Sequence, residues 1–479
     1  MKLISLGVCL VLLVNLCAGL ENFRVQEVYN WKQVLYDNLP FDGSVNIAKY
    51  QYYIPENNDI VAFGHHAKSG LSIAIVPRFR PGIPSSLNAF CTKDYPVGTS
   101  PRLWAFPDYK KNAIKAFYYG IPHDDAYNQT TIKRYSAGYV SNFFGSQYNA
   151  ISSNQQFPYQ GYFNPLEDIN IVSVYASHVD NYCNRLFVLD IGVLRYSSNE
   201  VYDVQRPAIV VFDLPDNGCE TRKFPVIRRV EIPDHLWTFP TGFAGLTLDY
   251  QQKSCDDLII YVSNLFEHIL IAYDYKNGQF WSIKDPSLKP TIAESRYLIR
   301  GTYEYFIPLG VQSLTLGHLD ESGNKIAYFA PVSSTSEFAV STKVLKDARN
   351  YSYKYTPGQF TLIGYRGCNS QSIHQVYDEI TRVIFFAEAQ SGRIRCWNTQ
   401  HPLNPDTVGT VYESHKIHSA SSIDIDSDGY LWFHTSQLPF MYTTSNPLNL
   451  FEINSRTFKV KTTEAIEDTV CALNLVYGE

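Results

Sequence analysis

Short apolar segments separated by polar turns recur along this chain. In the clearest copy, polar and apolar residues alternate over 421–426, a turn follows at Ser427-Asp428-Gly429, and an apolar segment covers 430–437. Alternation with a period of two and an Asp-Gly turn are signals of a β-hairpin. The pattern therefore predicts a hairpin whose second strand ends in a small or polar residue.

Five other segments have the same form. The second strands of the predicted hairpins end near residues 77, 190, 264, 331, 388 and 436, and further strand-like segments follow them. Three to four antiparallel strands per unit, repeated about six times, are typical of a β-propeller, whose closure also removes long sheet edges. We therefore predict an all-β fold, a six-bladed β-propeller.

We expect a single domain with an elaborated early blade. The widest interval between hairpins holds the segment 95–160, which is rich in Pro, Tyr, Asn and Gly. This segment is expected to form extra blade structure and surface loops. A β-sandwich or two all-β domains are the alternatives, but no linker rich in Gly, Ser or charged residues divides the chain.

The N-terminus has the pattern of a signal peptide. Lys2 precedes an apolar run over 3–16, and small residues follow at 17–19. The run is shorter than the roughly 20 apolar residues that a membrane span needs, which argues against an anchor. We expect a signal peptide over 1–19, a secreted, extracellular domain over 20–479 with a short C-terminal tail from about 463, and no membrane partner.

Composition and motifs exclude several kinds of function. The net charge is −6 and no long Lys/Arg run occurs, which argues against a nucleic-acid partner. The sequence lacks the Gly-x-Ser-x-Gly, His-Glu-x-x-His and phosphate-loop motifs, which disfavours a hydrolase or a nucleotide enzyme. We expect no cofactor.

We also expect no metal site. The segment 424–429 resembles the start of a calcium loop, but its twelfth position holds Thr435 where an acid is needed. His415 and His418, and the pair His65-His66, have no supporting Cys or acid motif. A hairpin turn and surface histidines explain these residues better.

Cysteines and sequons fit a secreted glycoprotein. Of the nine Cys, Cys9 and Cys17 lie in the signal peptide, so seven remain and at least one is free or bonds another chain. Cys368 and Cys396 flank the fifth hairpin, and Cys219 and Cys255 flank the strands between the second and third, so both are expected disulfides. Asn128 and Asn350 begin glycosylation sequons.

The first hairpin of each blade is expected to line the central channel. Antiparallel pairing places the start of its first strand and the end of its second strand on one face. The expected bases, if the protein is an enzyme, are Glu388 and Asp190. The expected ligand-binding residues are Phe243, Asn264, Gln312, Gln371, Phe386, Ser421, Ser422, Ser436 and Gln437, and Arg78 shares their face.

Such a face suits a small aromatic amine or catechol. A carboxylate pairs with an ammonium group, an aromatic ring stacks, and amides meet hydroxyls. The alternative is that these side chains satisfy backbone groups or line a water-filled channel.

Several segments resemble the yellow/major royal jelly protein family. They are 77–88 (PRFRPGIPSSLN), 183–192 (CNRLFVLDIG), 385–388 (FFAE), 396–399 (CWNT) and 431–433 (LWF), in this order. The resemblance covers nearly the whole mature chain. It implies secreted insect proteins with a six-bladed propeller and roles in cuticle pigmentation and melanin chemistry, dopachrome conversion, binding of biogenic amines, or nutrition.

The chain also departs from this family pattern. Relatives carry a second Cys about 20 residues before the Cys-Asn-Arg-Leu stretch, but 164–180 has none, so Cys183 is free or finds another partner such as Cys91. Ser436-Gln437 stands where the family has a Ser-Asn pair, and Asn264 stands where an Asp is common. Salivary relatives bind amines through the last blade, at places that Ser422 and Gln437 match approximately.

Three hypotheses about function stay open at this point. The first is a secreted yellow-type protein of the pigmentation pathway that binds or converts catechol or indole intermediates, by dopachrome tautomerisation if it is an enzyme. The second is an amine-binding protein without turnover, and the third is a structural or storage glycoprotein. The sequence does not separate an enzyme from a binder, and it does not give the oligomeric state.

Overall fold

The fold is described from a computed structural model of the chain. It describes residues 24–39, 53–112, 133–136, 171–197, 200–239, 241–251, 254–299, 303–350, 358–389 and 391–472. The predicted signal peptide and Asn128 lie outside these residues, as does most of the segment 95–160.

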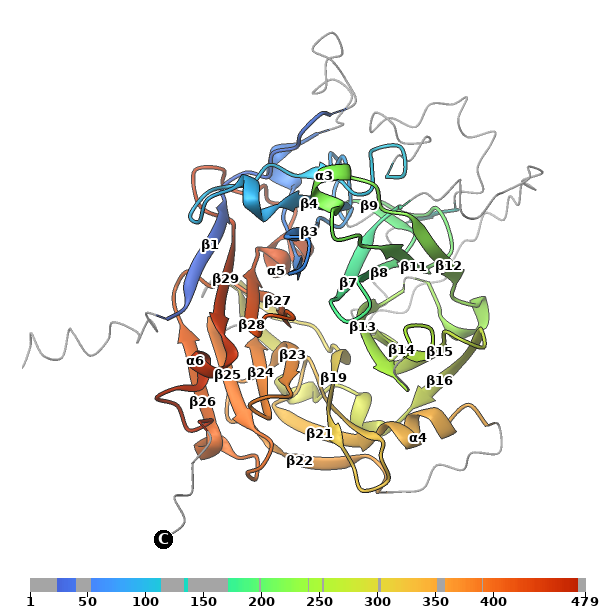
Figure 1. Cartoon of the computed structure of the whole chain (residues 1–479), viewed down its shortest axis with the longest axis vertical. Helices are drawn as coiled ribbons and strands as arrows, with labels where there is room; N and C mark the ends of the chain where they lie inside the picture. The colour runs from blue at the N-terminus through green and yellow to red at the C-terminus, as the bar shows by residue number, and fades with distance from the viewer. Residues whose placement is uncertain are drawn as a thin grey trace, which may run out of the picture.

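Six four-stranded antiparallel sheets form the blades of a β-propeller, as predicted (Figure 1). Blade 1 comprises β2 (Ala62–His66), β3 (Leu71–Ile75), β4 (Leu87–Cys91) and β5 (Trp104–Ala105). Blade 2 comprises β7 (Val174–Asp180), β8 (Arg185–Asp190), β11 (Ala208–Asp213) and β12 (Val226–Glu231). Blade 3 comprises β13 (Phe243–Tyr250), β14 (Leu258–Asn264), β15 (Ile269–Asp274) and β16 (Gln279–Lys284).

The second half of the ring repeats this plan. Blade 4 comprises β19 (Val311–Leu319), β20 (Lys325–Pro331), β21 (Ser336–Ser341) and β22 (Thr361–Tyr365). Blade 5 comprises β23 (Ser372–Asp378), β24 (Val383–Glu388), β25 (Arg393–Asn398) and β26 (Val408–Glu413). Blade 6 comprises β27 (Ala420–Ile425), β28 (Tyr430–Thr435), β29 (Ser455–Lys461) and β1 (Gln26–Trp31).

Short elements decorate the ring between the blades. The extra strands are β6 (Lys133–Ser136), β9 (Val193–Ser197), β10 (Glu200–Asp203), β17 (Arg296–Ile299) and β18 (Tyr303–Phe306). The helices are α3 (Gly218–Thr221), α4 (Thr342–Asp347), α5 (Leu438–Thr443) and α6 (Thr462–Ile466). Within the described residues, no helix is both long and apolar enough to cross a membrane.

The ring closes through strands from both ends of the chain. The first strands of neighbouring blades contact one another in the order β2, β7, β13, β19, β23, β27 and back to β2. The N-terminal β1 pairs with β29 near the C-terminus, from Gln26 opposite Lys459 to Trp31 opposite Ser455. The first and last strands of the described chain therefore complete one blade, and their pairing leaves no open gap in the ring.

The core lies between the blades. Six apolar clusters each join residues of two neighbouring blades, so every blade interface has its own cluster. Between blades 4 and 5, for example, Tyr328 packs with Phe386 and Trp397. Full burial of such an aromatic side chain contributes about 1.5–3 kcal/mol.

Hydroxyl groups on the first strands also join neighbouring blades. Ser422 Oγ of blade 6 accepts a hydrogen bond from the Phe63 amide of blade 1 at 3.1 Å. Ser313 Oγ of blade 4 accepts from the Gln375 amide of blade 5 at 2.9 Å. These bonds satisfy backbone amides of first strands that belong to different sheets.

Within the described residues, three disulfides cross-link the ring, and their pairings differ from the predicted ones. They join Cys91 to Cys219, Cys183 to Cys255, and Cys396 to Cys471, with Cα–Cα distances of 5.7, 5.8 and 6.1 Å. The predicted pairs Cys368–Cys396, Cys219–Cys255 and Cys91–Cys183 are therefore wrong. Cys368 is an exposed free thiol.

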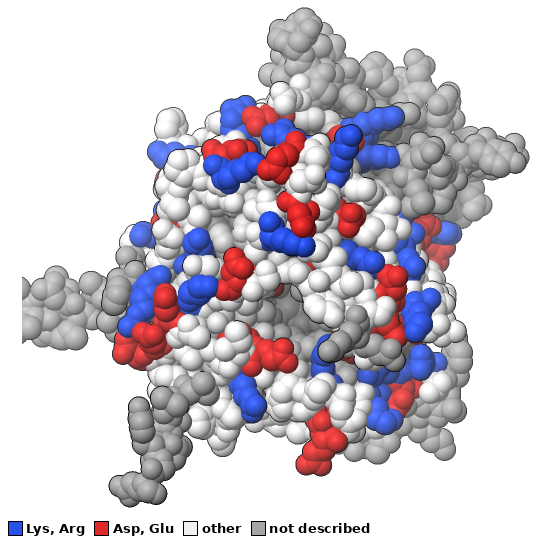
Figure 2. All heavy atoms as spheres, viewed as in Figure 1, with Lys and Arg blue, Asp and Glu red and all other residues white. Residues whose placement is uncertain are grey.

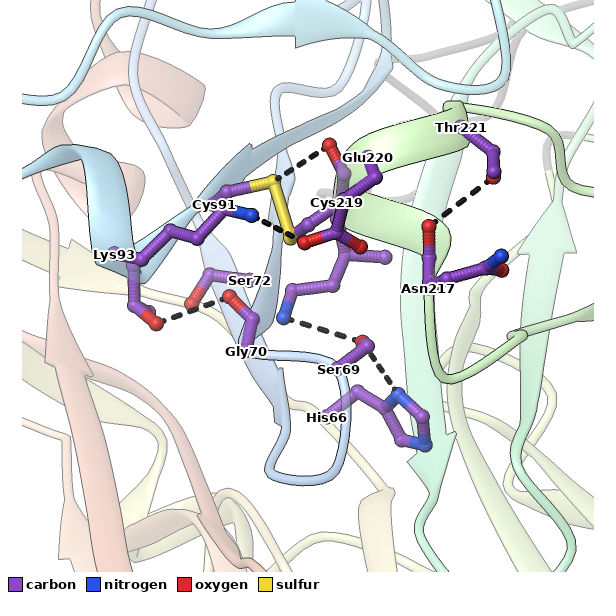
Figure 3. Close-up of a disulfide and its surroundings, with 12 residues drawn as sticks. His66, Ser69, Gly70, Ser72, Cys91, Lys93, Asn217, Cys219, Glu220 and Thr221 are labelled. Carbon is purple, nitrogen blue, oxygen red and sulfur yellow. Dashed lines mark hydrogen bonds and ion pairs between the residues drawn. A yellow bond between two sulfur atoms is a disulfide. The ribbon is translucent and has the colours of Figure 1, made fainter.

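The physical reason is the position of each cysteine in its blade. Cys183 and Cys255 both lie in the turn between the first and second strands, in neighbouring blades 2 and 3, so the repeat brings them side by side. Cys91 ends β4 of blade 1 and meets Cys219 of α3, which follows blade 2's third strand; Figure 3 shows this contact, flanked by the Lys93–Glu220 ion pair. The wrong predictions rested on closeness to a hairpin along the chain instead of on equivalent places in adjacent blades.

Candidate ligand-binding site

Two adjoining cavities occupy the middle of the ring. The mouth cavity has a volume of about 230 Å³ and the inner cavity about 210 Å³. They share four lining residues, Val61, Tyr175, Gln312 and Leu438, which mark the waist between them. Figure 2 shows a hollow near the centre of one face, with basic and acidic side chains interspersed around it.

Six aromatic side chains line the mouth cavity beside a larger number of aliphatic ones. Phe243 comes from the start of β13 and Tyr297 from the β17–β18 hairpin, while α5 supplies Phe440 and Tyr442. Tyr175 and Phe266 complete the set. The volume is below the roughly 300–1,000 Å³ of sites for drug-sized ligands, so the cavity suits a ligand of one or two rings.

Tyr175 and Tyr297 are neutral hydrogen-bonding groups. Burial raises the pKa of Tyr175 and of Tyr297 above the ordinary phenol value. The Tyr297 hydroxyl lies 2.9 Å from Ser333 Oγ, a contact that holds its ring against the cavity. Both phenols therefore keep their protons at physiological pH and present apolar faces with a polar tip.

Polar groups gather at the last blade. Ser436 donates its amide to Ser419 O at 3.0 Å, and the Asp59 carboxylate accepts the Gln437 amide at 2.7 Å. Gln437 is the N-cap of α5, so these bonds fix the entry of that helix. Ser419 Oγ is buried and has no hydrogen-bond partner within the described residues, so it is available to a ligand or a water.

The inner cavity is more polar and holds titratable groups. Gln312 Nε2 lies 2.8 Å from His374 Nε2, and burial lowers the pKa of His374 to about 4. Burial also raises the pKa of Asp424, while nearby His178 opposes that rise. Asp424 and His178 both line the inner cavity, so an acid and an imidazole face the same space.

Six of the predicted ligand residues line a cavity, but they are divided between the two cavities. Phe243, Gln312, Ser436 and Gln437 line the mouth cavity, and Gln312, Ser421 and Ser422 line the inner cavity. Ser421 Oγ has no hydrogen-bond partner in the described part of the chain, whereas Ser422 Oγ is committed to Phe63.

The predicted base Asp190 lies outside both linings. Its Oδ1 accepts the amides of Ser173 and Gly192 at 2.8 and 3.0 Å, and its Oδ2 accepts the Val172 amide at 2.9 Å and Gln205 Nε2 at 2.8 Å. The side chain is 1% exposed. Four donors therefore occupy this carboxylate, which holds the loops around β8 together.

Glu388, the other predicted base, is also buried and occupied. It accepts Arg393 Nε at 2.9 Å and Ser391 Oγ, and Arg395 Nη1 lies 3.7 Å away. Glu388 therefore closes the turn after β24 in a local ion pair.

The remaining predicted residues have structural partners. Asn264 Oδ1 accepts the amides of Phe266 and Glu267, Gln371 Nε2 donates to Glu294 O, and Phe386 packs in the core between blades 4 and 5. Asn264 and Phe386 lie in second strands, and Gln371 directly precedes the first strand of blade 5. None of the three lines the mouth cavity or the inner cavity.

Sequence reasoning missed several lining residues. Asp424 has the same strand parity as Ser422, so the predicted orientation of Ser422 also pointed Asp424 at the channel. Arg195 and Tyr297 come from the β9–β10 and β17–β18 insertions, outside the six-fold repeat, and nothing in the pattern marks them.

Comparison with known proteins gives the family. The family model "Major royal jelly protein" matches residues 172–471. The yellow-related salivary protein ASP2 of Phlebotomus orientalis is 30% identical over 90% of each chain, and the yellow-related salivary protein SP03 of Phlebotomus perniciosus is 28% identical over 97% of this chain and 98% of its own. The L-dopachrome tautomerase yellow-f of Drosophila melanogaster is 29% identical over 84% of this chain and 80% of its own. The chain belongs to the major royal jelly protein family.

Proposed function

We propose that this chain is a secreted protein that binds a small aromatic ligand, of the catechol or indole class, in the mouth cavity. The observation that carries the proposal is the cavity itself, a partly open space with six aromatic side chains, many aliphatic ones and a few polar groups on its wall. Aromatic faces stack on a ligand ring, and Gln312, Ser419 and Ser436 offer hydrogen bonds to ring hydroxyls.

Secretion is part of this proposal. The apolar segment 3–16 has the form of a signal peptide, and three disulfides fit an oxidising compartment. Asn350 is exposed at the end of the turn after α4, a place that suits a glycan. We place the mature domain at 20–479 and its setting in cuticle pigmentation or melanin chemistry, in line with the name of the relative yellow-f.

The geometry favours binding over conversion at the predicted bases, because Asp190 and Glu388 are both occupied. One observation supports conversion as the second candidate. Asp424 and His178 face the inner cavity, and tautomerisation of dopachrome needs a base that removes a carbon-bound proton and an acid that returns one to oxygen.

Calorimetric titration of the mature protein with catechol and indole tests the proposal. Ala389 lines the mouth cavity and is 8% exposed, so Ala389→Trp places a ring in the ligand's space. We expect saturable binding to the wild type and none to this variant. Ile380→Trp, at a turn residue that is 73% exposed, is the matched control and should bind normally.

Two outcomes would contradict the proposal. The first is no binding to the wild type at high micromolar ligand, and the second is equal binding to a folded Ala389→Trp variant. The urea midpoint of each variant shows that it is folded.

A further inference from the structure

The mouth cavity carries one permanently charged side chain. Among the lining residues that the structure describes, Arg195 of β9 is the one Lys, Arg, Asp or Glu. Its side chain is half-buried at the wall where α5 packs. His418 is the one other described lining residue whose side chain can carry a positive charge, and no described lining residue is acidic.

The guanidinium groups of two nearby arginines, Arg78 and Arg80, are fully engaged in hydrogen bonds. Arg78 donates five hydrogen bonds to backbone carbonyls, those of Ile83, Pro84, Asn112, Ile171 and Val172. Arg80 donates four, to the carbonyls of Met441, Thr444 and Asn446 around the end of α5. Both arginines are structural, and neither is among the described residues that line the mouth or the inner cavity.

Arg195 is different. Its amide is fixed by Arg78 O at 3.0 Å, but its guanidinium makes a single long hydrogen bond, from Nη1 to Tyr442 O at 3.4 Å. The guanidinium stacks on the Tyr442 ring, with Cζ 4.6 Å from the ring centre. Nε and Nη2 donate to no described residue, and an arginine edge of this kind is the geometry that binds a carboxylate through two parallel bonds.

The surrounding charges add to this preference. Burial, and then the charge of Arg195, lower the pKa of Arg80 to about 10, so positive groups lie close together at this wall. Asp59, whose charge raises the pKa of Arg80, accepts the Gln437 amide and is not among the described residues that line the cavity. An ammonium group in the mouth cavity would face a cation, with no carboxylate among the described lining residues.

We propose that the mouth cavity selects aromatic ligands that carry a carboxylate, with Arg195 as the residue that recognises it. The ring lies among the aromatic side chains, and the carboxylate accepts from Nε and Nη2 of Arg195. Aromatic acids, such as indole or catechol carboxylates, bind in preference to the corresponding amines. This inference rests on the proposed function and names its ligand class.

Three indole ligands of different charge test it by calorimetric titration: indole-3-acetate, indole and tryptamine. We expect the acetate to bind the wild type at least about tenfold more tightly than tryptamine. Arg195→Gln should weaken the acetate by about 10- to 100-fold, the range for loss of charge-assisted hydrogen bonds, and leave indole within about twofold. Arg195→Lys keeps the positive charge but loses the two parallel N–H donors, so its affinity for the acetate should lie between those of the wild type and Arg195→Gln.

The outcomes separate this inference from the proposed function. If indole binds but Arg195→Gln leaves the ratio of acetate to tryptamine affinity unchanged, the inference is wrong and the aromatic site stands. Tighter binding of tryptamine than of the acetate overturns it as well. If none of the three ligands binds, the proposed function fails, and the inference fails with it.

Discussion

Replacement of Asp190 by Asn tests whether the Asp190 carboxylate is structural or catalytic. Asp190 accepts four hydrogen bonds, two on each oxygen, and is 1% exposed. An Asn side chain has one oxygen and one NH₂ group, so two of the four donors would face another donor. Each buried unsatisfied donor costs about 1–3 kcal/mol, which predicts that the free energy of unfolding falls by about 2–6 kcal/mol.

Urea unfolding at 25 °C measures this loss, and a dopachrome absorbance assay on the same samples measures any turnover. Asp428→Asn is the matched control because Asp428 lies in the exposed β27–β28 turn, and it should change stability by less than about 0.5 kcal/mol. The reasoning would be refuted if Asp190→Asn kept wild-type stability and abolished dopachrome turnover, since that is how a catalytic base behaves.

Three further predictions concern the blades and the inner cavity. Cys255→Ser should lower the free energy of unfolding by up to about 4 kcal/mol, since the disulfide to Cys183 spans 72 residues. Peptide mapping of the unreduced wild type should find Cys255 bonded to Cys183 and not to Cys219. Arg366→Met should lower the free energy of unfolding by about 3–5 kcal/mol at pH 7, because it leaves the buried carboxylate of Glu337, 2.5 Å from Arg366 Nη1, without its ion-pair partner. Burial already raises the pKa of Glu337, so protonation relieves this cost, and the loss measured by urea unfolding should shrink as the pH falls toward the ordinary Glu pKa of about 4.3. Asp424→Asn should raise stability at pH 7, because a raised carboxyl pKa means that the folded state disfavours the charged form; the gain should vanish below about pH 4, and an unchanged or lower urea midpoint at pH 7 would contradict this.

The repeated units were predictable from the sequence because each blade carries its own local signal. Alternation over 421–426 and the Asp-Gly turn gave the hairpin of β27 and β28 almost to the residue. The role of β1 was not predictable in the same way. It pairs with β29 more than 400 residues later, and the residues of a six-residue strand do not indicate which distant strand it pairs with.

The candidate site was predictable only where it follows the repeat. Residues of first strands, such as Phe243, Gln312 and Ser421, line the cavities, because strand parity sets which side faces the axis. Glu388, at the end of second strand β24, does not line a described cavity, whereas Ser436 and Gln437, directly after second strand β28, do. A hairpin pattern alone does not separate these two cases. Arg195 comes from an insertion, so only the three-dimensional structure shows it at the wall.

The stretch 77–88, one of the segments that resemble the family, has a structural role. Arg78 and Arg80 spend their donors on backbone carbonyls, and Ser86 Oγ accepts the Val174 amide at 2.8 Å. The motif therefore fixes the loops and α5 around the mouth cavity. It shapes the site without supplying its chemistry.

A crystal structure of the mature protein with indole-3-acetate tests the central claim most directly. The account predicts the indole ring in the mouth cavity, against Phe243, Tyr297 and Tyr442, with the ligand carboxylate on Arg195. A ring found only in the inner cavity, or outside the channel, would contradict it.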